Sequence, residues 1–141
     1  MIDVGEKPVI SRTAIASGEI ILSEATIEKI KALDIEKGDV ITTSKIVGIS
    51  GAKKTSDLFP LCHPLNLNHV SVEIRVLDSR VFVEAIVKAK ERTGVEMEAL
   101  TAVMVTLLNI WDMTKMYEKD GNGQYPTTAI TNVRVMKKIK A

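Results

Sequence analysis

The chain has 141 residues, of which 45% are hydrophobic and 26% are charged, a balance typical of one globular domain with its own core. Its formal net charge of +1 excludes a global attraction to nucleic acid or to a membrane surface, and no apolar run is long enough to span a bilayer. The single cysteine, Cys62, excludes an intrachain disulfide, and residues 1–12 lack the apolar core of a secretory signal, so we expect one cytoplasmic domain over residues 1–141.

The first half of the chain predicts a strand followed by helical segments. Residues 12–22 are a candidate strand, weakened by Gly18. Ser23 is a suitable N-cap for a short helix that would run through Leu33, with Ile27, Ile30 and Leu33 on one side. Residues 38–57 are ambiguous, because their first residues favour a strand while the spacing of their small and apolar residues follows a helical period. Two prolines then enclose a rigid, non-regular turn at residues 60–64.

The second half predicts a hairpin, a long helix and a last strand. Residues 70–76 and 81–87 alternate between apolar and polar side chains around a short turn, which is typical of a β-hairpin. Residues 93–119 carry apolar side chains every three or four positions, as one buried face of a helix does. An extended run begins at Tyr125. This order of elements predicts an α+β fold, a split β-α-β arrangement with helices on one face of an antiparallel sheet.

The long helix separates two groups of polar residues that could do chemistry. Asp112 and Lys115 are three residues apart and share one face of the helix, whereas Glu98 lies near its other end. At ~1.5 Å of rise per residue, about 21 Å separates Glu98 from Asp112, so the two carboxylates cannot touch one small reacting group. If both are functional, they line a long ligand or serve sites shared between subunits.

Each candidate cluster also has a plain structural reading. Residues 37–39 could be a solvated link with a helix cap, and residues 53–64 a helix end with a packed turn. The carboxylates at residues 96–98 suit the start of a helix, and residues 112–115 could be a surface ion pair. Cys62 and the two histidines match no usual zinc spacing, so we expect no metal site.

A series of short segments becomes informative when the segments are taken in chain order. They are residues 1–4, 37–40, 52–58, 60–65, 93–102 and 112–115. Together they resemble the cyclic pyranopterin monophosphate synthase family of molybdenum-cofactor biosynthesis over nearly the whole chain. Two features depart from that family. Lys53-Lys54 stands where Lys-Arg is frequent, which keeps the charge but loses bidentate phosphate contact, and residues 121–141 replace a glycine- and lysine-rich tail. The resemblance therefore assigns no site residue to residues 121–141, and their role stays open.

The resemblance implies a fold, an assembly and a reaction. The fold would be ferredoxin-like, with residues 38–54 helical, and the subunits would form a homohexamer as a trimer of dimers. The substrate would be a cyclic dihydro-GTP, (8S)-3′,8-cyclo-7,8-dihydroguanosine 5′-triphosphate, which is converted to cyclic pyranopterin monophosphate with release of pyrophosphate. By resemblance, the catalytic residues are Asp112, Lys37 and Lys115, and the substrate-binding residues are Leu61, Cys62, His63, Met97, Glu98, Glu96, Lys53 and Arg12.

These residue types suit that chemistry. Rebuilding a purine as a pterin requires several proton transfers, and a lysine beside a second lysine is expected to have a lowered pKa that suits acid-base work near neutrality. Asp112 could take a proton or hold the ammonium of Lys115 in place. Positive charge is needed for the triphosphate and for the departing pyrophosphate. No redox step occurs, so we expect no cofactor.

Two other classes of function remain open from the sequence. A ferredoxin-like nucleic-acid-binding module would need aromatic side chains and a basic stripe on the exposed face of the sheet, which Ser71, Glu73 and Arg75 do not supply. A non-catalytic scaffold for the pathway would be indicated by loss of a catalytic lysine or aspartate, and these are all present.

Overall fold

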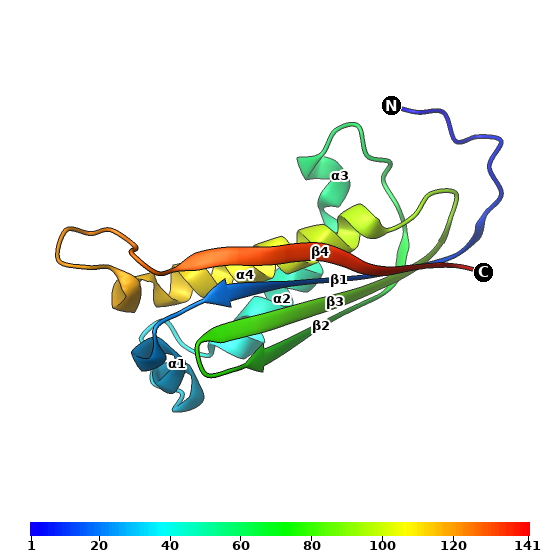
Figure 1. Ribbon diagram of the computed structural model, residues 1–141. Coiled ribbons are helices and arrows are strands. Elements are labelled where there is room, and N and C mark those ends of the chain that lie inside the picture. Colours follow the sequence, from blue (N-terminus) through cyan, green and yellow to red (C-terminus); the bar gives the residue numbers. More distant parts are fainter.

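The structure is a computed structural model that describes residues 1–141 (Figure 1). Its elements in chain order are β1 (Ile10–Ile21), α1 (Glu24–Lys31), α2 (Val40–Lys53), α3 (Thr55–Leu58), β2 (Leu67–Val76), β3 (Arg80–Glu91), α4 (Glu96–Glu118) and β4 (Ala129–Lys140). The strands form one sheet in the order β2-β3-β1-β4, and every neighbouring pair is antiparallel.

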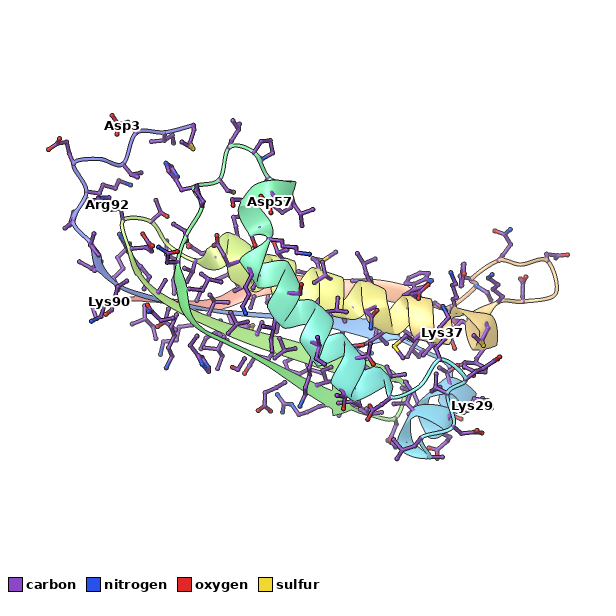
Figure 2. The ribbon with its side chains drawn as sticks, turned by 180° about the vertical axis from the view of Figure 1, so that it is seen from behind. Asp3, Lys29, Lys37, Asp57, Lys90 and Arg92 are labelled. Atoms are coloured by element: carbon purple, nitrogen blue, oxygen red, sulfur yellow. The ribbon has the colours of Figure 1, made fainter.

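Two connections that contain helices join strands that are not neighbours in this sheet. The first joins β1 to β2 with β3 between them, and the second joins β3 to β4 with β1 between them. This confirms the predicted α+β fold with a split β-α-β arrangement, for which ferredoxin-like remains our descriptive label. Figure 2 shows α2 and α4 side by side in front of the sheet. None of the helices combines the length and apolarity that a membrane-crossing segment needs.

The core forms where α4 lies on the inner face of the sheet. The predicted apolar face of α4 is buried, including Ala99, Val103, Leu107 and Ile110, and it meets the buried side chains of the central strands. Three buried residues of β1, Ala14, Ala16 and Gly18, are small. A Cβ atom added at Gly18 would lie 3.0 Å from the side chains of Leu107 and Val103. Small residues on β1 therefore let α4 approach the sheet closely.

The ambiguous segment is a helix, as the family resemblance implied. Asp39 caps α2 by accepting a hydrogen bond from the Thr42 backbone N–H at 3.0 Å. The buried face of α2 includes Ser44, Gly48 and Gly51, which pack against α4. A strand would not place these residues on one face, because successive side chains of a strand point to opposite sides.

The prediction for Leu33 was wrong. The capping role of Ser23 and the burial of Ile27 and Ile30 are confirmed, but α1 ends at Lys31 and Leu33 is 77% exposed. The backbone at Leu33 has φ of +56°, in the left-handed region, where the chain turns away from the helix. Leu33 therefore does not continue the buried side of α1.

Candidate active site

Three predicted catalytic residues meet at the C-terminal end of α4. Lys37 Nζ donates to Asp112 Oδ2 at 2.9 Å and to the Asp112 carbonyl oxygen at 3.0 Å. Lys115 Nζ lies 3.0 Å from Asp112 Oδ1, so each carboxylate oxygen has its own ammonium partner. Lys37 comes from the link before α2, where Gly38 adopts φ of +116°, a conformation that favours glycine. We call Lys37, Asp112 and Lys115 the lysine–aspartate cluster.

The charges of this cluster set the starting protonation states. Hydrogen bonds from Lys37 and Lys115 lower the pKa of Asp112, which is therefore ionised at neutral pH. The hydrogen bond to Asp112 raises the pKa of Lys115. The expected lowering of a lysine pKa is thus wrong for Lys115, because the carboxylate between the two ammonium groups outweighs their mutual repulsion.

A pocket of about 250 Å³ lies at the opposite end of α4. It is lined by five of the residues that the resemblance assigned to substrate: Leu61, Cys62, His63, Met97 and Glu98. Further lining comes from residues that were not predicted: Ile2, Val4, Lys7, Leu65, Thr93 and Gly94. The pocket therefore joins the start of α4 to the proline-bounded turn and to the N-terminal segment, and we call it the α4 N-terminal pocket.

Glu98 is the buried acid of this pocket. Only 4% of the residue is exposed. Burial raises the pKa of Glu98, and the neighbouring charge of Glu96 raises it further. A carboxyl group in such a position can accept a hydrogen bond from a ligand N–H as a carboxylate, or donate one when protonated. No pattern in the sequence predicts its burial, because a glutamate in a first helical turn is normally solvated.

His63 contacts the N-terminal segment. Its Nε2 donates a hydrogen bond to the carbonyl oxygen of Ile2 at 2.7 Å. This contact brings the first residues of the chain over the turn that carries Leu61 and Cys62, which explains why Ile2 and Val4 line the pocket. No group of three His, Cys, Asp or Glu side chains lies close enough together to hold a metal ion.

One chain does not bring the two groups together. α4 is continuous from Glu96 to Glu118, so the separation of about 21 Å between Glu98 and Asp112 along its axis stands. In Figure 2, Asp3 marks the N-terminal segment at one end of the molecule, and Lys37 lies at the other. The lysine–aspartate cluster and the α4 N-terminal pocket are therefore separate sites within one chain.

A comparison with protein families decides the affiliation of the chain. The MoaC family model matches residues 1–141. The chain belongs to the MoaC family. It is 54% identical over 141 residues to a probable cyclic pyranopterin monophosphate synthase of Sulfolobus acidocaldarius. That match covers 100% of this chain and 99% of the relative. It is also 54% identical over 140 residues to the Sulfurisphaera tokodaii protein of the same name, and that match covers 99% of this chain and 93% of the relative.

Another relative carries a different name. The chain is 53% identical over 140 residues to a Methanothermobacter thermautotrophicus protein, and the match covers 99% of this chain and 88% of the relative. That relative is named a probable cyclic pyranopterin monophosphate synthase accessory protein.

The remaining predicted substrate residues of this MoaC-family chain lie outside the α4 N-terminal pocket. Arg12 is buried and donates to the carbonyl oxygens of Glu91 and Arg92, at 3.4 and 3.0 Å. Lys53 lies by a separate surface hollow between α2 and β2. The structure therefore does not bring Arg12 and Lys53 together with His63 within one chain.

Glu96 has a partner that was not predicted. It forms an ion pair with Lys138 of β4. Burial acts to raise the pKa of Glu96, but the hydrogen bond from Lys138 lowers it, and the lowering prevails. The C-terminal segment, to which the resemblance assigned no site residue, thus contacts a predicted one through Lys138. No local motif marks this contact, although the family model matches this segment as well.

Proposed function

We propose that this MoaC-family chain converts (8S)-3′,8-cyclo-7,8-dihydroguanosine 5′-triphosphate to cyclic pyranopterin monophosphate and pyrophosphate. The observation that carries the proposal is the lysine–aspartate cluster, in which Lys37 and Lys115 are 2.9 and 3.0 Å from the two oxygens of Asp112. The names of the relatives at 54% identity support the same reaction. The activity is that of a lyase that needs no redox cofactor.

In this mechanism, Lys115 begins as a proton donor. Its raised pKa keeps it protonated at neutral pH, so it can protonate a ring nitrogen or oxygen as the purine opens. Lys115 then becomes a neutral amine that can accept the next proton, and Asp112 stabilises whichever lysine is charged. The second ammonium, from Lys37, supplies positive charge to the same place.

The phosphate chemistry follows from the product. A substrate hydroxyl oxygen forms a new bond to the α-phosphorus, the bond to the pyrophosphate oxygen breaks, and the hydroxyl proton passes to a base. Pyrophosphate leaves as an anion, and preorganised cations stabilise the charge that develops on it. Lys53 and Arg12 are our candidates for phosphate contact, and Glu98 for the N–H edge of the guanine.

We also propose that each active site forms between two copies of one domain that comprises residues 1–141, within a trimer of dimers. The α4 N-terminal pocket alone, at about 250 Å³, is smaller than the ~300–1,000 Å³ typical of small-molecule sites. A two-fold axis would place the Glu98 end of one chain beside the Asp112 end of its partner. Two equivalent composite sites would then form at one contact.

The deciding experiment is a turnover assay with the cyclic dihydro-GTP substrate. We expect the purified protein to release pyrophosphate and form cyclic pyranopterin monophosphate in equal amounts, with heat-denatured protein as the control. Absence of both products would overturn the proposal. It would favour a non-catalytic role, which the accessory name of the Methanothermobacter thermautotrophicus relative makes a specific alternative.

A further inference from the structure

A second cavity lies beside the lysine–aspartate cluster. Its volume is about 420 Å³, and its charged members are Asp112 and Lys115. The other lining side chains are apolar or aromatic: Leu108, Trp111, Tyr125 and Ile130. The cavity thus presents an aromatic and aliphatic surface directly beside the groups that would transfer protons, and the roles assigned above leave that surface unused.

Two aromatic rings form one wall of this cavity. The rings of Trp111 and Tyr125 have centroids 5.2 Å apart and meet at 62°, an edge-to-face arrangement. Trp111 precedes Asp112 on α4, so the position of its ring is tied to that of the carboxylate. Asp112 is the main cause of the raised pKa of Lys115, and Tyr125 is close enough to add to that effect.

Tyr125 is held by a loop with an ordered hydrogen-bond pattern. The loop connects α4 to β4 and extends beyond the end of α4 in Figure 1. Asp120 Oδ1 accepts from the backbone N–H groups of Asn122 at 2.8 Å and Gln124 at 3.0 Å. Thr128 Oγ1 donates to Glu118 at 2.7 Å and fixes the other side of the loop. Pro126 further restricts the backbone of Tyr125 to extended conformations.

We propose that Tyr125, together with Trp111, forms the wall against which the bicyclic ring of the substrate packs while Lys115 and Asp112 act on it. The inference rests on the proposed function and assigns a substrate-binding residue to the segment after residue 120, to which the resemblance assigned none. A purine or pterin ring has a flat π-face, and aromatic side chains bind such faces by stacking. A held ring also keeps its nitrogen atoms at a constant distance from Lys115, which proton transfer requires.

The test compares three substitutions at Tyr125. Tyr125→Ala removes the ring and should raise KM about 10- to 100-fold, the range that follows from alanine substitution of base-stacking residues. Tyr125→Leu keeps apolar volume without a π-face and should raise KM as well. Tyr125→Phe should keep a KM near that of the wild type, because the ring face rather than the hydroxyl makes the contact. Met116→Ala, an exposed side chain outside the cavity lining, is the control.

Binding can be measured independently of turnover. Trp111 is the only tryptophan of the chain, so its fluorescence reports directly on this cavity. In a Lys37→Ala background, which should bind without turnover, the cyclic dihydro-GTP substrate should change the Trp111 emission. Adding Tyr125→Ala should raise the Kd by the same factor as the KM.

The possible failures are distinguishable. If the wild type forms product while Tyr125→Ala and Tyr125→Leu both keep its KM, the wall is not used, although the proposed function stands. An unchanged Trp111 emission at saturating substrate would overturn the inference in the same way. If the wild type forms no product, the proposed function itself is wrong.

Discussion

Asp112 forms ion pairs with two ammonium groups at an exposed position, where such pairs add little to the free energy of unfolding. Side chains of the lysine–aspartate cluster are all more than a third exposed, and ion pairs in water contribute little to the free energy of unfolding because solvent screens them. Stability therefore does not explain why two lysines converge on one carboxylate. The proposed proton transfer would explain it, since each lysine could act as acid or base while Asp112 compensates its charge.

Removal of either lysine should abolish turnover without unfolding the protein. We expect Lys37→Ala and Lys115→Ala each to lower kcat at least ~100-fold, the typical effect of losing a general acid or base. Thermal melts followed by circular dichroism should overlay the wild type. Lys31→Ala is the matched control, because Lys31 makes only surface ion pairs, at 3.8 Å, with Glu28 and Asp78. Near-normal product formation by either variant would remove that lysine from the mechanism.

At this scale the sequence predicted which residues lie together better than it predicted their environments. The family resemblance predicted that Lys37, Asp112 and Lys115 act together, and they do lie in contact. It did not predict the direction of the Lys115 pKa, since that depends on a 3.0 Å contact to Asp112. The burial of Glu98 depends on segments far away in the chain, which no local pattern encodes.

Close packing of α2 against α4 depends on glycine. A Cβ atom added at Gly48 would overlap Thr106 Oγ1 and lie 3.0 Å from Val72 Cγ2, and one added at Gly51 would overlap Val105. Thr106 and Val72 have short side chains, so their γ atoms cannot move away from an added Cβ atom by rotation of a long side chain. The two helices can therefore approach only while these positions have no side chain.

Gly48→Ala should destabilise the fold although alanine favours helices. The gain of about 1 kcal/mol in helix propensity is offset by overpacking, which typically costs 1–3 kcal/mol, so we expect a net loss of up to about 2 kcal/mol. Urea denaturation would measure it. Thr43→Ala, at an exposed position of α2, isolates the propensity effect and should not destabilise. A Gly48→Ala variant as stable as the wild type would refute the packing argument.

Glu118 ties the end of α4 to the start of α1. Its carboxylate accepts from Ser23 N–H at 3.2 Å, Ser23 Oγ at 2.8 Å and Thr128 Oγ1 at 2.7 Å, and from Thr26 Oγ1. Burial acts to raise the pKa of Glu118, but the hydrogen bonds from Thr26, Thr128 and Ser23 lower it below the ordinary value of 4.5. The folded state thus favours the ionised form.

The sign of the pH effect follows from this lowered pKa. The contribution of Glu118 to stability is fully present above pH 4.5, the ordinary pKa of a glutamate in the unfolded chain. It is lost as the pH falls through the lower pKa of Glu118 in the folded state, because the unfolded chain binds the proton at a higher pH. Glu118→Gln should lose about 1–3 kcal/mol at neutral pH, since buried donors lose their partner. Below pH 4.5 its stability should fall less steeply than that of the wild type in urea melts. Parallel curves for the two proteins would contradict this role.

Among the elements, those with strong apolar periods were predictable. The hairpin and α4 have regular apolar faces, with Val83 and Val103 buried and with Val70, Ile74 and Val76 of β2 partly buried. The buried face of α2 instead consists largely of small or polar residues such as Ser44 and Gly48, so its hydrophobic period is weak. Its helical state depends on packing against α4, and only the family resemblance indicated it.

At the scale of the whole molecule, α4 separates the lysine–aspartate cluster from the α4 N-terminal pocket. The separation of about 21 Å was predictable from helix geometry alone, because α4 is unbroken between Glu98 and Asp112. A nucleoside triphosphate could span much of that length, but its base and its phosphates would then have to reach opposite ends of one chain. The proposed two-fold dimer would remove this conflict, since it would place the Glu98 end of one chain beside the Asp112 end of its partner.

Complementation between two inactive variants should test this assembly. We expect Asp112→Ala and Glu98→Ala each to lose activity alone. After the oligomers are dissociated, mixed and reassembled, a mixed dimer contains one intact composite site and one doubly damaged site. Random pairing should therefore restore roughly a quarter of the wild-type activity.

The control is a mixture of each variant with itself, carried through the same dissociation. Native mass spectrometry should show that mixed dimers form, and melts should show that Glu98→Ala remains folded. If mixed dimers form and no activity returns, each site belongs to a single chain. The distance along α4 would then have to be spanned by the substrate itself, with its base near the lysine–aspartate cluster and its phosphates toward the α4 N-terminal pocket.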